Sequence, residues 1–327
     1  MILRNIKNLR GFATHSNLNS IQKPTPSVFN VFDRSTKTWQ KEVAASNLQD
    51  SRTVDYIKNE VGESFRDRLL DIKRRYTKAI CIGSGSNQAA RVLDEEELAD
   101  DINIADSSVK AVLRDQDSDV YFAKIPNRIQ IDEENPSFDN IFNPNSTDII
   151  VSSLGLHWVN DLPGALIQFN RALKPDSPFL GCLFGGDTLF ELRTSLQLAE
   201  QERWGGFGPH VSPMTDTTDV GNLMNRAGFT LLTIDIDDLI INYPSMFELM
   251  EDLKFMGESN AINGRRTHIS RDTLIAASEI YKSLHGNQDG TIPATFQIIN
   301  VIGWKRSDDQ LKPLKRGTAT RSMKELE

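Results

Sequence analysis

The stretch AICIGSGSNQAARVLDEEELADDINIAD, residues 79–106, decides the fold class of this 327-residue chain. It opens with a short apolar run, passes through a turn rich in glycine and serine, and continues with helical periodicity. A second apolar run then ends at Asp106. A strand, a helix and a second strand in this order predict two parallel strands joined by a helical crossover.

The same alternation continues along the chain. Apolar runs predict further strands at 128–131, 148–154 and 179–184, and the segments 108–115 and 162–173 have the pattern of helices between them. Each predicted strand ends at or near an acid or a glycine, and apolar strands bounded in this way suggest a sheet that is covered on both faces. We therefore predict an α/β protein with a doubly wound, Rossmann-like sheet.

The remaining segments are expected to surround this core. Residues 24–78 are charged and periodic and predict a helical N-terminal cap, and residues 79–304 form the main domain. Within that domain, residues 204–290 are expected to be a loop and a helical insertion on the substrate side, before a last strand at 294–303. Residues 305–327 are polar and predict a disordered tail.

The first 23 residues differ from the rest in their charge. They contain Arg4, Lys7, Arg10 and Lys23 but no Asp or Glu. A basic, acid-free and amphipathic start is typical of a mitochondrial transit peptide, so we predict one at residues 1–23. The alternative is a frayed terminus with a chance bias in charge.

Composition excludes several classes of function. The 45 acidic and 37 basic residues give a net charge of −8, which argues against duplex nucleic acid as the main partner because phosphate binding needs a basic surface. No apolar run reaches the length of about 18 residues that a transmembrane helix needs. The two cysteines, Cys81 and Cys182, fit no zinc pattern and are expected to be buried thiols.

Small and acidic residues follow three successive strands, where a wound sheet binds its ligands. Gly83 and Gly85 would allow a ligand to approach the backbone at the end of the first strand. Asp106 lies about 20 residues further on, where such folds place a carboxylate on ribose hydroxyls. Asp132 and Glu133 end the third strand and could accept from an adenine amino group. Together they predict a nucleotide site.

Each of these residues also has a plain structural reading. A turn between a strand and a helix uses glycine without any ligand. Asp106 could cap a helix that starts near Ser107 or Ser108. The pair Asp132 and Glu133 could belong to a solvated acidic loop.

The motifs taken together resemble the class I S-adenosylmethionine-dependent methyltransferase superfamily over about residues 79–186. The resemblance rests on the glycine loop, the acid after the second strand, the acidic pair after the third strand, the strand at 147–150 and the turn Leu173-Lys174-Pro175-Asp176-Ser177. It implies S-adenosyl-L-methionine as a cofactor. The sequence departs from the family pattern at Cys81, where an acid is usual, and at Asn87, where a third glycine is usual.

A narrower resemblance covers residues 152–305. The segments SSLGLHWVNDLPGAL, LFGGDTLFELRTSLQLAE, NYPSMFELMEDLKFMGESNA and PATFQIINVIGWK resemble the family of mitochondrial complex I assembly factor 5. The resemblance implies an arginine hydroxylase that acts on a core subunit of complex I during assembly, with other assembly factors as partners. It also implies peripheral association with the matrix face of the mitochondrial inner membrane. Methyl transfer is only presumed for that family.

Hydroxylation of a carbon needs an oxidant, and the sequence does not show its source. None of the five histidines is part of a His-x-Asp or His-x-Glu pair, so no metal site is predicted. His157 follows the fourth strand and could act as a base, and Asp187 follows the fifth strand and could pair with a substrate guanidinium. The alternatives are a core histidine and a helix N-cap near Glu191.

The sequence leaves alternatives open for two further segments and for the function of the protein. The loop at 204–213 could be a lid over the site or an ordinary connection. The stripe of apolar residues at 246–256 could be core or a peptide groove. Besides arginine hydroxylation, the sequence allows a methyltransferase, with protein or carboxyl O-methyl transfer, or a non-catalytic assembly chaperone.

Overall fold

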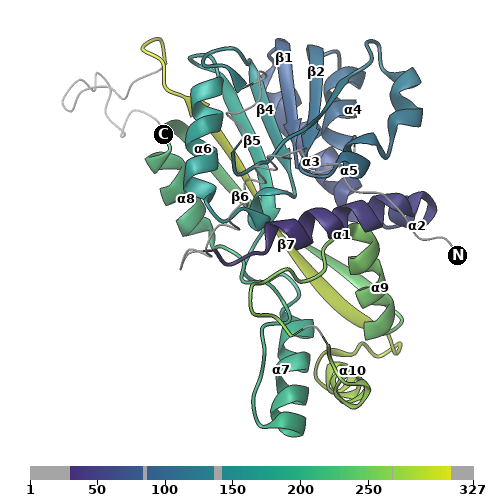
Figure 1. Ribbon diagram of the computed structural model, residues 1–327. Coiled ribbons are helices and arrows are strands. Elements are labelled where there is room, and N and C mark those ends of the chain that lie inside the picture. Colours follow the sequence, from purple (N-terminus) through teal and green to yellow (C-terminus); the bar gives the residue numbers. More distant parts are fainter. Residues whose placement is uncertain (1–29, 84–86, 136–141, 267, 311–327) are drawn as a thin grey trace, which may run out of the picture. The chain divides into compact units, whose positions relative to one another are not determined.

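A computed structural model describes residues 30–83, 87–135, 142–266 and 268–310 (Figure 1). Its sheet has seven strands in the order β3-β2-β1-β4-β5-β7-β6. The strands β1 to β5 run parallel to one another, whereas β7 is antiparallel to both β5 and β6. The strand bounds are β1 Tyr76–Ile82, β2 Ala99–Asp106, β3 Asn127–Gln130, β4 Ile149–Ser153, β5 Pro178–Phe184, β6 Phe229–Tyr243 and β7 Ile292–Lys305. The α/β fold class predicted from the sequence is confirmed.

Helices cover both faces of this sheet. Ala79 and Cys81 of β1 pack in one apolar cluster with α3, α4 and α7, and Ile80 and Ile82 pack in a second cluster with α6 and α8. Since neighbouring side chains of a strand point to opposite faces, two buried faces require a continuous apolar strand. The helices of these layers are α3 Tyr56–Ile72, α4 Gln88–Glu95, α5 Val109–Leu113, α6 Leu162–Ala172, α7 Phe190–Trp204 and α8 Thr217–Arg226.

The helix α1 (Arg34–Ser46) crosses the carboxyl ends of the central strands and is followed by the short helix α2 (Leu48–Thr53) (Figure 1). It begins after Asp33, whose carboxylate accepts from the backbone N–H of Thr36 at 3.0 Å, which is the usual chemistry of an N-cap. α1 therefore closes the edge of the sheet at which wound folds bind their ligands.

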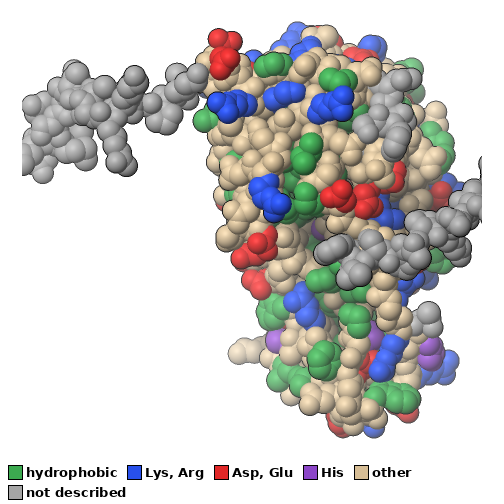
Figure 2. Space-filling view, turned by 60° about the vertical axis from the view of Figure 1, so that its left-hand side comes forward, with side chains coloured by type: hydrophobic (Ala, Val, Ile, Leu, Met, Phe, Trp, Pro, Cys, Tyr) green, Lys and Arg blue, Asp and Glu red, His purple; other side chains and the backbone are tan. Residues whose placement is uncertain are grey.

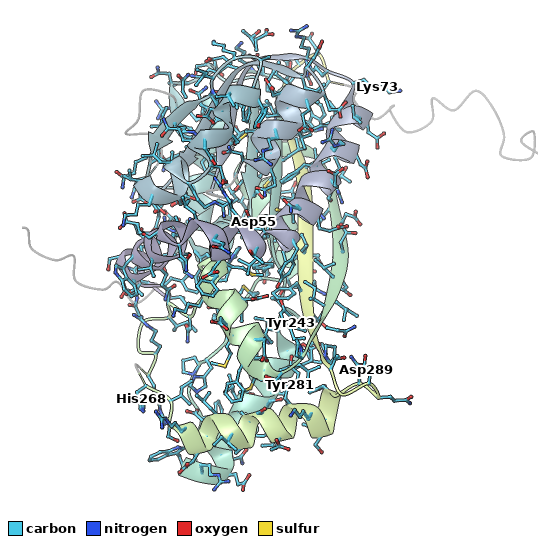
Figure 3. The ribbon with its side chains drawn as sticks, turned by 90° about the vertical axis from the view of Figure 1, so that its right-hand side faces the viewer. Asp55, Lys73, Tyr243, His268, Tyr281 and Asp289 are labelled. Atoms are coloured by element: carbon cyan, nitrogen blue, oxygen red, sulfur yellow. The ribbon has the colours of Figure 1, made fainter. Side chains whose placement is uncertain are left out.

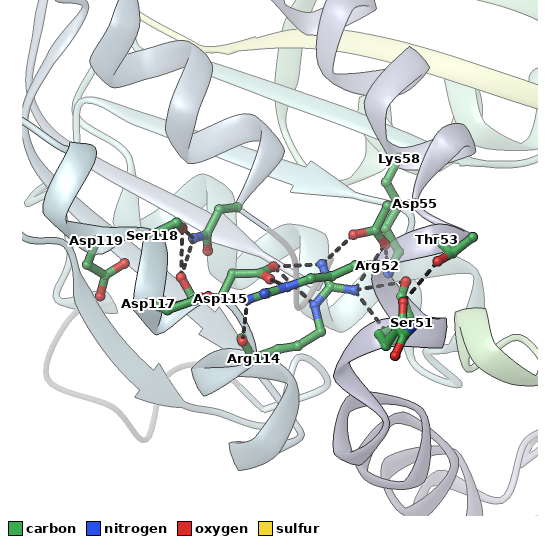
Figure 4. A network of polar contacts seen from close by, with 12 residues as sticks. Ser51, Arg52, Thr53, Asp55, Lys58, Arg114, Asp115, Asp117, Ser118 and Asp119 are labelled. Carbon is green, nitrogen blue, oxygen red and sulfur yellow. Dashed lines mark hydrogen bonds and ion pairs between the residues drawn. The ribbon is translucent and has the colours of Figure 1, made fainter.

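A buried network of ion pairs joins α2 and α3 to Arg114 and Asp115, the two residues that follow α5 (Figure 4). The guanidinium of Arg114 donates to the Asp55 carboxylate at 3.0 Å and to Asp115 at 3.0 Å, and also to the Ser51 hydroxyl at 3.0 Å. Arg114 is 4% exposed in its side chain, and both carboxylates are nearly as buried. The partners satisfy the charge of Arg114, which would otherwise be costly to bury.

Two helices lie between the last two strands, namely α9 (Met246–Met256) and α10 (Arg271–His285). Within the range 204–290, α8 and β6 belong to the sheet and its layers, so the helical insertion consists of α9 and α10. Tyr243 ends β6, and Tyr281 of α10 donates its hydroxyl to the Pro293 carbonyl at 2.8 Å (Figure 3). Tyr56 of α3 contacts Tyr243 and donates its hydroxyl to the Asp252 carboxylate of α9 at 2.9 Å, which joins α3 to this insertion.

Some predictions concern residues that the structure does not describe. The proposed transit peptide at 1–23, Gly85 and most of the tail at 305–327 lie outside the described residues. Within the part that is described, every helix is too short or too polar to cross a bilayer. On the face drawn in Figure 2, Lys and Arg side chains are interspersed with Asp and Glu side chains.

Candidate functional site

The ends of β1 and β4 meet through two glycines. Gly83 has a φ of +86°, a left-handed conformation that favours glycine. A Cβ atom added to Gly155, which follows β4, would lie 2.7 Å from the Cα atom of Gly83. The absence of side chains at Gly83 and Gly155 is therefore explained by backbone packing, independently of any ligand.

The structure brings Asp106 and Glu133 together beneath α1. The ammonium of Lys41 lies 3.1 Å from both carboxylate oxygens of Asp106 and 3.2 Å from Oε1 of Glu133. Neither carboxylate is exposed, and Lys41 is 10% exposed in its side chain. The N-cap of α5 is Ser108 rather than Asp106, so the cap alternative for Asp106 is wrong.

The charges of this cluster offset the cost of burial. Burial alone would raise the pKa of Glu133, but the positive charges of Lys41 and Arg34 outweigh it and lower the pKa to about 2. Burial raises the pKa of Asp106, and the negative charge of Glu133 adds to this effect against the attraction of Lys41. Because Asp106 and Glu133 are like charges, a cation between them stabilises the ionised pair.

Asp132 is held at the edge of the same cluster. Its carboxylate accepts from Nη2 of Arg34 at 3.2 Å, and its side chain is 54% exposed. Arg34 also contacts Glu133 and lies 3.6 Å from the Glu134 carboxylate. The pair Asp132 and Glu133 is thus neither a simple solvated loop nor a free acceptor, since both residues are neutralised by Arg34 of α1.

An adenosyl group does not fit this rim while α1 lies across it. The cavity between Lys41, Gly83 and Asp106 has a volume of about 30 Å³. Such a cavity has room for ordered water but not for a nucleoside, which is many times larger than a water molecule. The acceptors that would hold a ribose are present, but Lys41 occupies them.

A much larger cavity of about 440 Å³ lies next to the rim. Its walls are mainly apolar and come from β5, α7, α9 and β7, with Phe184, Leu192, Leu196, Met214, Met250 and Phe296 among them. Trp158 and Glu258 also line this cavity, and Glu258 faces the smaller cavity as well. Polar and charged residues line the rest of the cavity, among them Arg265 and Arg266. A concave, mainly apolar site with some polar groups is the usual form of a binding site for a small group or a side chain.

Glu258 is the anionic residue of this cavity. Its Oε2 accepts from the indole N–H of Trp158 at 2.7 Å and lies 3.3 Å from Nε2 of His157. Among the described residues, its Oε1 accepts no hydrogen bond. Burial would raise the pKa of Glu258, but Lys37 and its hydrogen-bond partners lower it to about 2, so the residue is an anion at neutral pH.

Lys37 of α1 supplies the nearby positive charge. Its ammonium lies 3.3 Å from the centroid of the Trp158 ring and donates to the carbonyls of Gly257 at 3.0 Å and Ser259 at 2.8 Å. This arrangement is a cation–π contact completed by two acceptors. Burial lowers the pKa of Lys37 to about 7 against the attraction of Glu258.

The two residues predicted to be catalytic do not line the large cavity. His157 is buried against Phe184, and burial lowers its pKa, so its imidazole is neutral at pH 7. Asp187 is exposed and accepts from Gln297 at 3.2 Å. α7 begins after Leu189, which has a φ of +54°, so the N-cap alternative for Asp187 is wrong.

The large cavity bears on the alternatives left open for the stripe at 246–256 and for the loop at 204–213, since residues of both segments line it. In the stripe at 246–256, Met250 and Leu253 line the cavity, whereas Met246, Leu249 and Met256 are buried. From the loop at 204–213, the cavity is lined by His210, Val211 and Ser212.

The position of Glu258 in this site could not be predicted from the sequence, because its hydrogen-bond partner Trp158 lies 100 residues away and no local motif links the two residues. Among the residues with described positions, no group of three His, Cys, Asp or Glu side chains is arranged to hold a metal ion.

Comparisons with known proteins agree with this architecture. The family model described as "Methyltransferase domain" matches residues 56–234. A solved structure from Bacillus halodurans C-125 aligns with a TM-score of 0.53 and 13% identity, covering 75% of this chain and 100% of that chain. At that identity the alignment shows the fold alone.

Much closer relatives are found by sequence similarity. A Danio rerio protein named "Arginine-hydroxylase NDUFAF5, mitochondrial" is 46% identical over 323 residues, covering 98% of this chain and 96% of that protein. The Homo sapiens protein of the same name is 45% identical over 302 residues, covering 92% of this chain and 85% of that protein. These matches confirm both resemblances drawn from the sequence motifs. The chain belongs to the methyltransferase-domain family and, within it, to the family of proteins named arginine-hydroxylase NDUFAF5.

Proposed function

We propose that this protein hydroxylates an arginine side chain on a core subunit of complex I during assembly of that complex. The observation that carries the proposal is similarity over nearly the whole chain to proteins named arginine-hydroxylase. The range covered by the Danio rerio relative includes β7 and α9, which line the large cavity, and α10 of the same insertion.

The large cavity supports this proposal by its chemistry. An arginine side chain has an apolar stem and a planar cation at its end, so it needs an apolar channel that leads to an anion. The cavity offers mainly apolar walls and the ionised carboxylate of Glu258. Two cations also line it, but Arg265 lies 3.6 Å from the Asp33 carboxylate and Arg266 lies 3.2 Å from the Glu200 carboxylate, so each is paired elsewhere. We assign Glu258 to hold the guanidinium, since carboxylates bind it with charge-assisted hydrogen bonds.

The described side chains bind and orient the substrate. Trp158 and His157 fix the orientation of Glu258 through its Oε2, and this leaves Oε1 for the substrate. The apolar walls exclude water from the arginine stem. Insertion of an oxygen atom into a C–H bond also needs an oxidant, and the proposal assigns no residue of this chain to that step.

The direct test is mass spectrometry of the product. Purified protein is incubated with isolated core subunits of complex I in a mitochondrial matrix extract that supplies the oxidant, and peptides are mapped. We expect one arginine to gain the mass of one oxygen atom, and the gain to be lost with the Glu258→Gln variant. If no arginine gains oxygen in a subunit that the protein binds, the proposal is wrong.

We also propose that the protein acts at the matrix face of the mitochondrial inner membrane, together with other assembly factors. The names of the relatives include the word mitochondrial, and residues 1–23 have the composition of a transit peptide. Fractionation of mitochondria followed by carbonate extraction tests this proposal. A peripheral protein is released by carbonate, whereas one that stays in the membrane pellet would contradict it.

A second candidate function is a non-catalytic assembly chaperone, which the occupation of the rim by Lys41 favours. The two functions differ in their dependence on the cavity. A chaperone that binds its client elsewhere would support complex I assembly equally well with Glu258→Gln, provided that the variant is stable. Loss of complex I in cells that carry this variant at normal abundance would exclude the chaperone role alone.

A further inference from the structure

Helix α1 presents a cation to the carboxylates that a wound sheet uses for a nucleoside. In such sheets the acid at the end of the second strand accepts from ribose hydroxyls, and here that acid is Asp106. Lys41 lies 3.1 Å from both of its oxygens and also 3.4 Å from the Gly83 carbonyl. The same ammonium lies 3.2 Å from Glu133. Lys41 thus uses the polar acceptors at the ends of both β1 and β2.

From this geometry we propose that α1 is a built-in competitor for an adenosyl ligand, and that Lys41 must leave Asp106 and Glu133 before such a ligand binds. The cavity of about 30 Å³ leaves no room for a ribose beside the ammonium. Both oxygens of Asp106 already accept from the ammonium, and its Oδ1 also accepts from the backbone N–H of Ser108 at 3.0 Å, so few lone pairs remain for a ribose hydroxyl. Occupancy by the ligand and occupancy by Lys41 therefore exclude each other.

The contacts of α1 divide into two groups. Near its start, Lys37 is anchored to the Gly257 and Ser259 carbonyls, and Gln40 donates to the Asn260 carbonyl at 3.0 Å. Lys41, which directly follows Gln40, contacts both Asp106 and Glu133, and Arg34 at the first position of the helix also contacts Glu133. A lysine has a flexible stem of four carbons, so its ammonium can withdraw while Lys37 and Gln40 hold the helix start.

The competition predicts a definite effect on affinity. When a binding-competent state is populated only in part, the apparent dissociation constant rises by the inverse of that fraction. If Lys41 leaves the rim in one molecule out of about ten or fewer, its removal tightens binding by about tenfold or more. The inference concerns the adenosyl ligand and does not depend on the arginine chemistry proposed above.

The first experiment measures the binding of S-adenosylhomocysteine by calorimetry. We compare the wild type, Lys41→Met and the control Lys110→Met, which removes a lysine that contacts α1 through Ser46 but does not reach the rim. We expect the dissociation constant to fall at least tenfold for Lys41→Met and to stay unchanged for Lys110→Met. Equal or weaker binding by a folded Lys41→Met variant overturns the proposal, as does a lack of binding by both proteins.

The second experiment uses the wild type and remains decisive if Lys41→Met does not fold. Lysine acetylation by a soluble active ester is followed by mass spectrometry, with and without saturating S-adenosylhomocysteine. Lys41 is nearly buried, so we expect slow labelling in the free protein and several-fold faster labelling in the complex, while exposed Lys110 is unchanged. Unchanged or slower labelling of Lys41 in the complex overturns the proposal.

Discussion

Replacement of Glu258 by glutamine tests the assignment of the large cavity most directly. The substitution keeps the size of the side chain and removes the negative charge. The amide oxygen can still accept from Trp158, so the hydrogen bond of 2.7 Å need not be lost. What is lost is the charge-assisted interaction of the second oxygen with a guanidinium.

The expected magnitude follows from this loss. A hydrogen bond to a charged group contributes about 1.5–3 kcal/mol, and about 1.4 kcal/mol corresponds to a factor of ten. We therefore expect the dissociation constant for Nα-acetylarginine methylamide to rise by about 10- to 100-fold in Glu258→Gln. The citrulline counterpart, which has the same shape but no charge, should bind the wild type and the variant equally.

The assay is ligand titration followed by nuclear magnetic resonance, in which weak binding can be measured. The matched control is Glu191→Gln, since Glu191 is also buried but is bound to Thr295 and does not line the cavity. If Glu258→Gln binds the arginine probe as well as the wild type does, Glu258 does not hold the guanidinium. A similar loss in Glu191→Gln would point to a general structural effect.

Three further predictions concern stability. Arg114→Met removes one cation from buried Asp55 and Asp115, which keep Lys58 and Arg52 as partners, so urea unfolding should show a loss of about 1–3 kcal/mol, against at most about 0.5 kcal/mol for exposed Arg91→Met. Gly155→Ala forces a Cβ against Gly83, and a loss of about 1–3 kcal/mol is expected by the same method; an unchanged midpoint would refute the close contact. The folded pKa of Lys37 lies near 7, below the ordinary value of 10.5, so the unfolded chain retains a proton that the folded chain releases between these values. The free energy of unfolding of the wild type, relative to Lys37→Met, should therefore rise from about pH 7 to about pH 10, and a constant difference would contradict the shift.

The sheet and its acidic edge could be predicted because they depend on local patterns. Apolar runs mark the strands, and parallel strands bring their carboxyl ends to one edge whatever the lengths of the connections. Asp106 and Glu133 were found in this way, and they do lie together. The helix content before β1 could likewise be predicted from apolar periodicity.

The partners of these acids could not be predicted, because no local pattern encodes them. Lys41 is separated from Asp106 by 65 residues and from Glu133 by 92 residues. On the sequence alone, Lys41 belongs to a charged amphipathic helix, where a lysine is usually solvated. For Asp187, an acid shortly before a helix suggested a cap, but the chain reaches α7 through Leu189 in a left-handed conformation.

The pairing of β6 with β7 has a consequence for how this family can diversify. Tyr243 at the end of β6 is paired with Ile292 at the start of β7, so the chain that contains α9 and α10 leaves and rejoins the sheet at adjacent points. Such a segment can be exchanged between relatives without a change in strand order, provided that its contacts with Lys37 and Trp158 are kept. A chimera that carries this segment from a distant relative would thus test whether the segment determines which protein substrate is bound.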